Sequence, residues 1–188
     1  MAAAPLPLFT VGHGTLAAEG LVEVLRGAGV ALVVDVRAFP GSRRHPQFAR
    51  EEMARWLPDA GVAYRWEPRL GGRRRGRADS PNVALRHPAF RAYADHMAGP
   101  EFAAGLEDLL ADAAVRPTAA MCSESLWWRC HRRLVSDAAV LVRGGSVAHV
   151  LHDGRVVPHQ VTEGARLAES GDHVVYDVGG QAPLPLSL

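Results

Sequence analysis

The chain is short of several residue types. Its 188 residues include no lysine and no isoleucine, a single asparagine (Asn82) and only two cysteines. Without a lysine amine, Schiff-base catalysis and the phosphate-binding loop that needs a Gly-Lys pair are excluded. Two cysteines do not make the disulfide framework of a small secreted domain. The missing lysines are typical of a GC-rich genome and carry no information about a site.

Long apolar segments are also missing from the sequence. No stretch approaches about 20 uncharged apolar residues, so we expect no membrane span and no membrane partner. The first residues lack the basic segment and the apolar run of a signal peptide. Together with two reduced thiols, this pattern predicts a cytoplasmic protein.

The residues that are present favour a folded domain. Hydrophobic residues make up 48% of the chain and charged residues 22%, which excludes a disordered chain. The length suits a single domain, with a core over about 8–160 and a tail at 181–188 that we expect to fray. The 21 basic residues are all arginine and face 20 acidic residues. A net charge of +1 does not attract nucleic acid to the molecule as a whole.

Short apolar runs alternate with amphipathic segments along the chain. Buried strands are predicted over 8–11, 31–36, 62–66, 118–122 and 146–151. Helices are predicted from a Thr15 cap to Gly27, and over 48–57, 88–97, 100–114 and 130–143. This alternation predicts an α/β fold with a doubly wound, mostly parallel sheet. The residues beyond the last strand, with a turn at 153–154, predict a small β excursion.

Polar residues that can take part in catalysis or binding gather where the predicted strands end. Ligands of parallel sheets bind beyond the carboxyl ends of the strands, so we expect one site at this edge. The candidates are Gly12 and His13 after the first strand, Asp35, Arg37, Ser42, Arg43 and Arg44 after the second, Cys122 and Glu124 after the fourth, and Cys130, His131, Arg132 and Arg133 at the start of a helix.

The two cysteines are the candidate reactive groups. Cys130 is predicted at the start of a helix beside arginines, where the pKa of a thiol is lowered. Cys122 ends a buried strand and is a partner or an alternative. A small buried hydrophobic side chain is the competing interpretation of each. The cysteine-phosphatase loop is excluded, because Trp128 and Ser136 stand where it needs arginine, six residues after each cysteine.

The other candidates have both a catalytic and a structural interpretation. His13 lies between glycines. Its catalytic interpretation is an acid, a base or a hydrogen-bond donor to an anion, and its structural interpretation is a histidine hydrogen-bonded within a tight turn. Asp35 and Arg37 point to the same face of a strand and form either a structural ion pair or part of a catalytic group. Glu124 orients a base or pairs with an arginine. No cofactor is predicted, and a zinc site of the cysteines with His13 or His45 stays open.

Arginines crowd one predicted loop. Six of them lie between residues 65 and 77 (Arg65, Arg69, Arg73, Arg74, Arg75 and Arg77), against Glu67 alone. Arginine binds phosphate through two parallel hydrogen bonds, and Trp127 and Trp128 offer stacking faces for bases. A solvated basic turn is the alternative interpretation of the loop.

Several of these segments resemble the signature of one family. They are Thr-Val-Gly-His-Gly-Thr at 10–15, Val-Asp-Val-Arg at 34–37, Pro-Gly-Ser-Arg-Arg-His-Pro-Gln-Phe at 40–48, Leu-Gly-Gly at 70–72, Cys-Ser-Glu at 122–124 and Cys-His-Arg-Arg at 130–133. Over residues 8 to about 160 the chain resembles the domain-of-unknown-function 488 (DUF488) family. The resemblance implies a Rossmann-type α/β fold and a site at these motifs, but no reaction. Family members usually carry serine at Gly14, so we assign that position no side-chain role.

Two functions follow from these patterns. The first is an enzyme acting on a phosphate-bearing ligand, a nucleotide or nucleic-acid component. Its arginines (Arg37, Arg43, Arg44, Arg132 and Arg133) would hold the anion, and His13, His131, Asp35 or Glu124 would move protons. Cys122 or Cys130 would be the nucleophile or a ligand. The alternative is a non-catalytic nucleic-acid or nucleotide-binding module that uses the basic loop and the two tryptophans. We favour the enzyme, because a phosphate grip alone needs neither thiols nor carboxylates.

Overall fold

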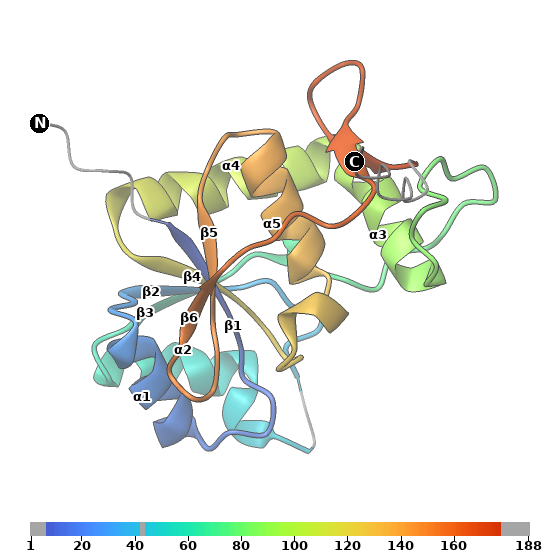
Figure 1. Cartoon of the computed structure of the whole chain (residues 1–188). Coiled ribbons are helices and arrows are strands. Elements are labelled where there is room, and N and C mark those ends of the chain that lie inside the picture. Colours follow the sequence, from blue (N-terminus) through green and yellow to red (C-terminus); the bar gives the residue numbers. More distant parts are fainter. Residues whose placement is uncertain (1–6, 42–43, 178–188) are drawn as a thin grey trace, which may run out of the picture.

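The structure is a computed structural model of the chain that describes residues 7–41 and 44–177. A six-stranded sheet lies between two layers of helices (Figure 1). Its strands are β1 (Leu8–Gly12), β2 (Leu32–Asp35), β3 (Ala63–Trp66), β4 (Thr118–Cys122), β5 (Val147–Val150) and β6 (Val156–Pro158), in the order β3-β2-β4-β1-β5-β6. Only β6 pairs antiparallel with its neighbour. The expected Rossmann-like, mostly parallel α/β fold is confirmed.

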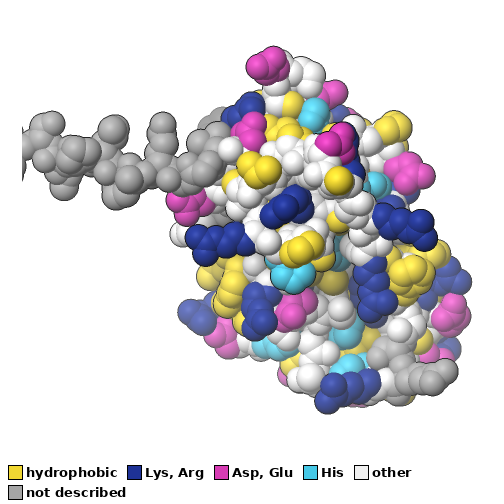
Figure 2. Space-filling model, turned by 90° about the vertical axis from the view of Figure 1, so that its right-hand side faces the viewer, with side chains coloured by type: hydrophobic (Ala, Val, Ile, Leu, Met, Phe, Trp, Pro, Cys, Tyr) yellow, Lys and Arg dark blue, Asp and Glu magenta, His cyan; other side chains and the backbone are white. Residues whose placement is uncertain are grey.

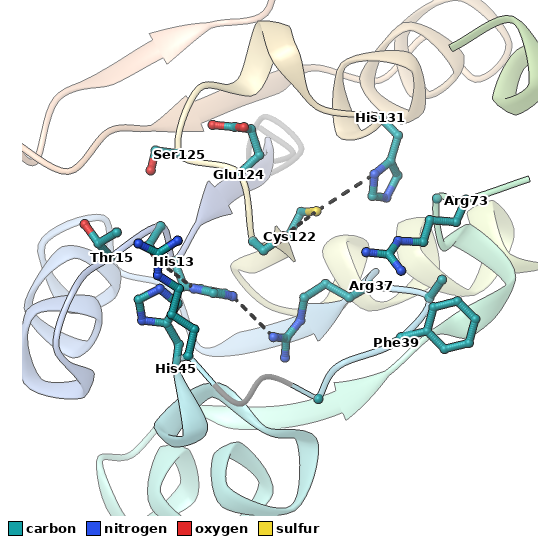
Figure 3. Close-up of a pocket in the computed structure, with 16 residues that line it drawn as sticks. His13, Thr15, Arg37, Phe39, His45, Arg73, Cys122, Glu124, Ser125 and His131 are labelled. Atoms are coloured by element: carbon teal, nitrogen blue, oxygen red, sulfur yellow. Dashed lines mark hydrogen bonds between the residues drawn. The ribbon is translucent and has the colours of Figure 1, made fainter. Parts of the chain in front are cut away.

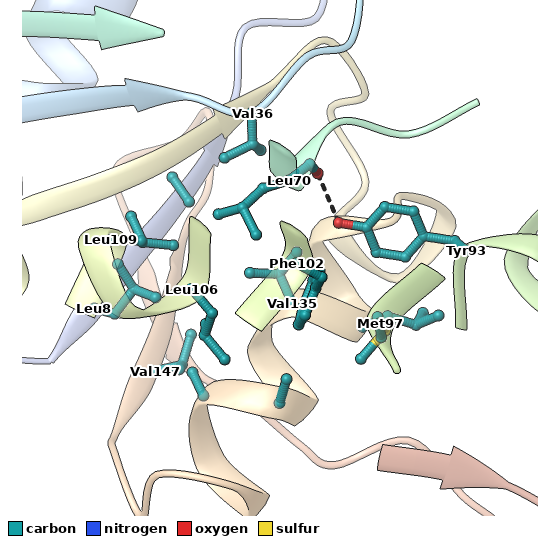
Figure 4. Close-up of a cluster of buried hydrophobic side chains, with 14 of the residues drawn as sticks. Leu8, Val36, Leu70, Tyr93, Met97, Phe102, Leu106, Leu109, Val135 and Val147 are labelled. Carbon is teal, nitrogen blue, oxygen red and sulfur yellow. Dashed lines mark hydrogen bonds between the residues drawn. The ribbon is translucent and has the colours of Figure 1, made fainter. Parts of the chain in front are cut away.

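The helices bury both faces of this sheet. Helices α1 (Ala18–Gly27) and α2 (Arg50–Asp59) cover one face, and α4 (Pro100–Val115) and α5 (Arg132–Leu141) cover the other (Figure 1). Helix α3 (Pro88–Met97) lies to the side and packs against α4 and β8. Figure 4 shows part of the larger core, in which Leu106 and Leu109 of α4 pack with Val135 of α5. Each such buried side chain stabilises the fold by about 1.5–3 kcal/mol. Within the described residues, no helix is long and apolar enough to cross a membrane.

The strand register brings the carboxyl ends of three strands together. Gly12 of β1 lies opposite Cys122 of β4, and Asp35 of β2 lies opposite Met121. Pairing continues beyond β1 and β4, because the amide of His13 donates to the carbonyl of Cys122 at 3.0 Å. The residues that follow β1, β2 and β4 therefore share one edge of the sheet, as expected from the pattern.

Three predicted helix starts are displaced. Helix α2 begins at Arg50 and not at Phe48, because a 3-10 turn, η1 (Pro46–Phe48), precedes it. Helix α1 begins at Ala18, and its N-cap is Ala17 without a side-chain hydrogen bond, so Thr15 does not cap it. Helix α5 begins at Arg132, because a 3-10 turn, η3 (Trp127–Arg129), ends at Cys130. Cys130 has extended backbone with φ −121° and ψ 150°, so its thiol is not on the helix N-terminus.

The C-terminal β excursion is confirmed. Strands β5 and β6 form a hairpin around residues 153–154. Two further strands, β7 (Ala165–Leu167) and β8 (Val174–Tyr176), pair antiparallel in a second sheet. The tail predicted to fray, 181–188, lies outside the described residues.

Candidate functional site

A cleft of about 790 Å³ opens where β1, β2 and β4 end (Figure 3). Its walls come from the loops after these strands and from the loop after β3. We call it the cationic cleft. It is lined by His13, Gly14, Thr15, Arg37, Ala38, Phe39, Gly41, Arg44, His45, Gly72, Arg73, Cys122, Ser123, Glu124, Ser125 and His131. The structure thus brings many of the predicted site residues to one cavity.

His131 connects the two cysteines. Its Nδ1 lies 3.9 Å from Sγ of Cys122 and 3.7 Å from Sγ of Cys130. Its Nε2 lies 3.0 Å from the carbonyl oxygen of Val36, which can only accept a hydrogen bond. Nε2 therefore carries a proton, and the neutral ring presents its Nδ1 lone pair to the thiols. A thiol proton can pass to this nitrogen and leave a thiolate beside an imidazolium.

Of the two thiols, Cys122 has the lower pKa. A hydrogen bond from Cys130 lowers the pKa of Cys122 well below its ordinary value, and the charges of His131 and Arg132 act in the same direction. Its hydrogen bond to Cys122 and its own burial raise the pKa of Cys130. The sequence predicted the lowered pKa at Cys130, and that prediction is wrong because helix α5 starts beyond it.

Asp35 and Arg37 form a buried ion pair. The guanidinium donates through Nε to Oδ1 at 2.8 Å and through NH2 to Oδ2 at 2.6 Å. Tyr64 and the backbone amide of Arg37 also donate to Asp35, at 2.7 and 3.1 Å. Burial lowers the pKa of Arg37, but the hydrogen bonds and the charge of Asp35 outweigh it and raise the pKa overall. Arg37 is thus a fixed cation whose charge Asp35 balances, which favours the structural interpretation of the pair.

His13 is neutral and fully hydrogen-bonded. Arg37 donates to its Nε2 at 3.2 Å, so Nδ1 carries the proton and donates to the carbonyl of Gly14 at 3.0 Å. The ring also stacks on Phe48, with 4.2 Å between ring centres. Burial, and after it the charge of Arg37, lowers the pKa of His13 to about 4. This geometry makes His13 a positioning residue for Arg37.

Three candidates for anion binding do not line the cationic cleft. Arg132 is 1% exposed, and its NH2 donates to the carbonyls of Glu124 and Ser125 at 2.7 and 2.9 Å. A Cβ at Gly12 would lie 1.8 Å from the carbonyl oxygen of Glu124. Both residues therefore shape the loop that carries Glu124. Arg133 lies over the ring of Phe90, 5.0 Å from its centre.

Two arginines supply the uncompensated charge of the cleft. Arg44 and Arg73 are exposed, and neither has a carboxylate partner among the described residues. Arg73 has φ +62°, the left-handed conformation that non-glycine residues rarely adopt, and its guanidinium lies 5.9 Å from the centre of the Phe39 ring. Such backbone strain is typical of functional sites. The candidates Ser42 and Arg43 lie outside the described residues.

Most of the basic loop is neutralised. Arg65 and Arg69 form ion pairs with Glu67 and with two acids of α4, Asp112 and Asp108 respectively. Arg77 pairs with Asp79, and Arg74 donates to backbone carbonyls of residues 68, 69 and 71. Arg75 is exposed. Figure 2 shows basic side chains interspersed with acidic ones on one face. Sequence spacing missed Asp108 and Asp112, because α4 lies some 40 residues further along the chain.

A chain of buried polar residues was not predicted from the sequence. Thr10 donates to Nδ1 of His149 (2.6 Å), whose Nε2 lies 2.9 Å from Nδ1 of His159. The Nε2 of His159 lies 2.9 Å from Asp137. Trp127 stacks on His149 at 4.0 Å with 9° between the rings. This chain fixes the half-buried Trp127, one of the two predicted stacking residues, against the sheet.

The two thiols and the imidazole also have the geometry of a metal site. The ligand atoms of Cys122, Cys130 and His131 all lie within 4.8 Å of one another. Sulfur and imidazole nitrogen are ligands that suit zinc. The group contains His131 in place of the histidines that the sequence suggested, and zinc binding itself stays a prediction.

The fold and the cleft define a Rossmann-like α/β protein with a thiol–imidazole site at the carboxyl edge of its sheet. The chain belongs to the family described as "Domain of unknown function DUF488", whose model matches residues 17–139, more than half of the chain. The match includes both cysteines and leaves out the segment around His13. Neither the comparison with curated proteins nor that with solved structures found a match.

Proposed function

We propose that the cationic cleft is the active site of an enzyme that uses Cys122 as a nucleophile on a phosphate-bearing substrate. The observation that carries this proposal is the contact of Cys122 with His131 on the wall of the cleft, because it provides a thiolate and an adjacent acid at neutral pH. Arg44 and Arg73, which have no carboxylate partner within the described part of the chain, line the same cavity.

The reaction proceeds in two steps. The Cys122 thiolate attacks phosphorus, a sulfur–phosphorus bond forms, and the bond from phosphorus to the leaving oxygen breaks. The imidazolium of His131 gives its proton to that oxygen. Water then attacks phosphorus, His131 accepts a water proton, and the sulfur–phosphorus bond breaks to restore the thiolate. The sum is hydrolysis of a phosphate ester, with every proton returned.

The remaining residues position the substrate. Arg44 and Arg73 bind the phosphate oxygens and stabilise the charge of the transition state. Arg37 presents a guanidinium oriented by Asp35 and His13. Glu124 is exposed at the rim, where its carboxylate orients the attacking water.

Alkylation with iodoacetamide tests this proposal on the full chain. We expect Cys122 to react faster than a free thiol at pH 7, and inorganic phosphate to slow the reaction. Replacing both Arg44 and Arg73 by alanine should remove most of the protection, whereas Arg75→Ala, an exposed arginine of the same loop outside the cleft, should not. The Cys122→Ser variant should no longer hydrolyse a chromogenic phosphate monoester.

Three results would contradict the proposal. One is a Cys122 that reacts no faster than a free thiol. Another is binding of nucleic acid with a steep salt dependence that survives Cys122→Ser, since this describes the non-catalytic module. A third is one equivalent of zinc that copurifies with the chain and is lost in Cys130→Ser.

A further inference from the structure

A second cleft, of about 450 Å³, adjoins the cationic cleft. The two clefts share Gly72, Arg73, Cys122, Ser123, Glu124 and His131. The far wall of the second cleft is aromatic and carries Phe90, Tyr93 and Trp128. We call it the aromatic cleft. The reactive thiol therefore lies at the junction of a cationic and an aromatic cavity.

Trp128 is held in place although it is exposed. The residue is 46% exposed, and its ring meets Trp127 edge-on, with 5.7 Å and 90° between the rings. Trp127 in turn stacks on buried His149. The 3-10 turn η3 carries both tryptophans. The contact with Trp127 orients the indole of Trp128, so less conformational entropy is lost when a ligand stacks on it.

The charge of the two cavities differs in a way that orients a ligand. Arg37 and Arg44 line only the cationic cleft, and Phe90 and Trp128 line only the aromatic one. Arg73, with its left-handed backbone, borders both. The aromatic cleft also contains Arg129 and the cationic cleft Phe39, but the buried Arg37–Asp35 group and Arg44 lie only on the cationic side and Trp128 only on the aromatic side. This arrangement favours a ligand that places its anion in the cationic cleft and its ring in the aromatic one.

We propose that the aromatic cleft binds the base of a nucleoside monophosphate whose phosphate lies in the cationic cleft. This inference rests on the proposed function. The bond between phosphorus and the sugar oxygen then lies next to Cys122, where the thiolate attacks it. The base stacks on Trp128, which every nucleobase can do through its flat face, so stacking binds the base without reading its identity. A cavity of this size is in the range of small-ligand sites.

Protection of Cys122 from iodoacetamide tests the inference on the intact chain. The probes are adenosine monophosphate, ribose 5-phosphate, which lacks the base, and adenosine, which lacks the phosphate. Half-protection should need at least about fivefold less adenosine monophosphate than ribose 5-phosphate, since base stacking strengthens binding by roughly that factor or more. Adenosine should protect less than adenosine monophosphate.

Variants separate the two clefts. Trp128→Ala should make adenosine monophosphate no better at protection than ribose 5-phosphate, and should leave protection by ribose 5-phosphate unchanged. Trp128→Phe should retain most of the stronger protection by adenosine monophosphate. Arg73→Ala should weaken protection by both phosphates. Equal protection by the two phosphates, unchanged in Trp128→Ala, would overturn the inference and leave the proposed function standing. No protection by any phosphate compound would overturn both.

Discussion

At the scale of single residues, the site depends on which atom carries each proton. The carbonyl of Val36 holds a proton on Nε2 of His131 and so leaves Nδ1 free for the thiols. Arg37 likewise occupies Nε2 of His13. His131 is therefore available for proton transfer to the thiols and His13 is not, although the sequence made both of them candidates for that role.

Gly12 provides a residue-scale prediction. Gly12→Ala should destabilise the fold by roughly 2–3 kcal/mol, because its Cβ would meet the backbone carbonyl of Glu124 at 1.8 Å. Gly20→Ala is the matched control: in α1 the nearest atom would be 3.6 Å away, and alanine favours a helix by up to about 1 kcal/mol. Urea unfolding measures both. Equal effects of the two changes would contradict the close packing at Gly12.

Much of the site could be predicted from the positions of the strand ends in the sequence. The spacing placed His13, Arg37, Cys122 and His131 on one edge of the sheet, and the structure has all four in one cleft. The role of Arg132 could not be predicted, since its burial under the loop at 123–126 depends on tertiary packing that no local pattern encodes.

At the scale of elements, alternating patterns found every strand and helix of the main sheet up to β5. The starts of α1, α2 and α5 were misplaced by about two residues, because a turn and two 3-10 segments interrupt the apolar spacing there. The buried polar chain from Thr10 to Asp137 was missed for a different reason. It joins β1, β5 and α5 through side chains that are far apart in the sequence.

Asp137 is the key acceptor of that chain. It is fully buried and accepts from the amide of Thr162 (2.8 Å), from His159 (2.9 Å) and from the hydroxyl of Tyr176 (2.8 Å). Asp137→Ala should therefore cost about 3 kcal/mol or more, since three donors lose their partner. Asp137→Asn keeps an acceptor oxygen and should cost less than half as much. If both variants unfold at the same urea concentration, the hydrogen bonds of Asp137 do not hold β8 to α5.

At the scale of the whole molecule, a near-zero net charge hides local differences. The loop at 65–77 forms ion pairs with acids that follow it in the sequence, so the molecule has no broad cationic face there. At the cleft, Arg44 and Arg73 have no carboxylate partner among the described residues. This distribution favours a small anionic ligand over a long nucleic acid.

Stability should fall as the pH is lowered from about 6.5 to 5. Burial lowers the pKa of His13 to about 4 and that of His149 to about 3, against 6.5 for an ordinary histidine, and the pKa of His96 is lowered too. Over this window the unfolded chain binds protons that the folded chain does not, so each of the first two histidines removes roughly 2 kcal/mol by pH 5. Carboxylates with a lowered pKa, such as Glu67, reduce the free energy of unfolding only at lower pH.

Urea unfolding at pH 7 and pH 5 checks this pH dependence. His149→Gln should reduce the difference between the two conditions, because glutamine does not titrate. A midpoint that is the same at both pH values would contradict neutral, buried histidines in the folded chain.

The central claim, that Cys122 is a thiolate activated by His131, is tested most directly by the pH dependence of its alkylation. The rate at Cys122, assigned by mass spectrometry, should reach its plateau with an apparent pKa well below the value of about 8.5 for free cysteine. His131→Asn should move that pKa upward, whereas His87→Asn, at the exposed rim of the aromatic cleft, should not. A Cys122 that titrates like a free thiol, or a Cys130 that reacts first, would contradict the account.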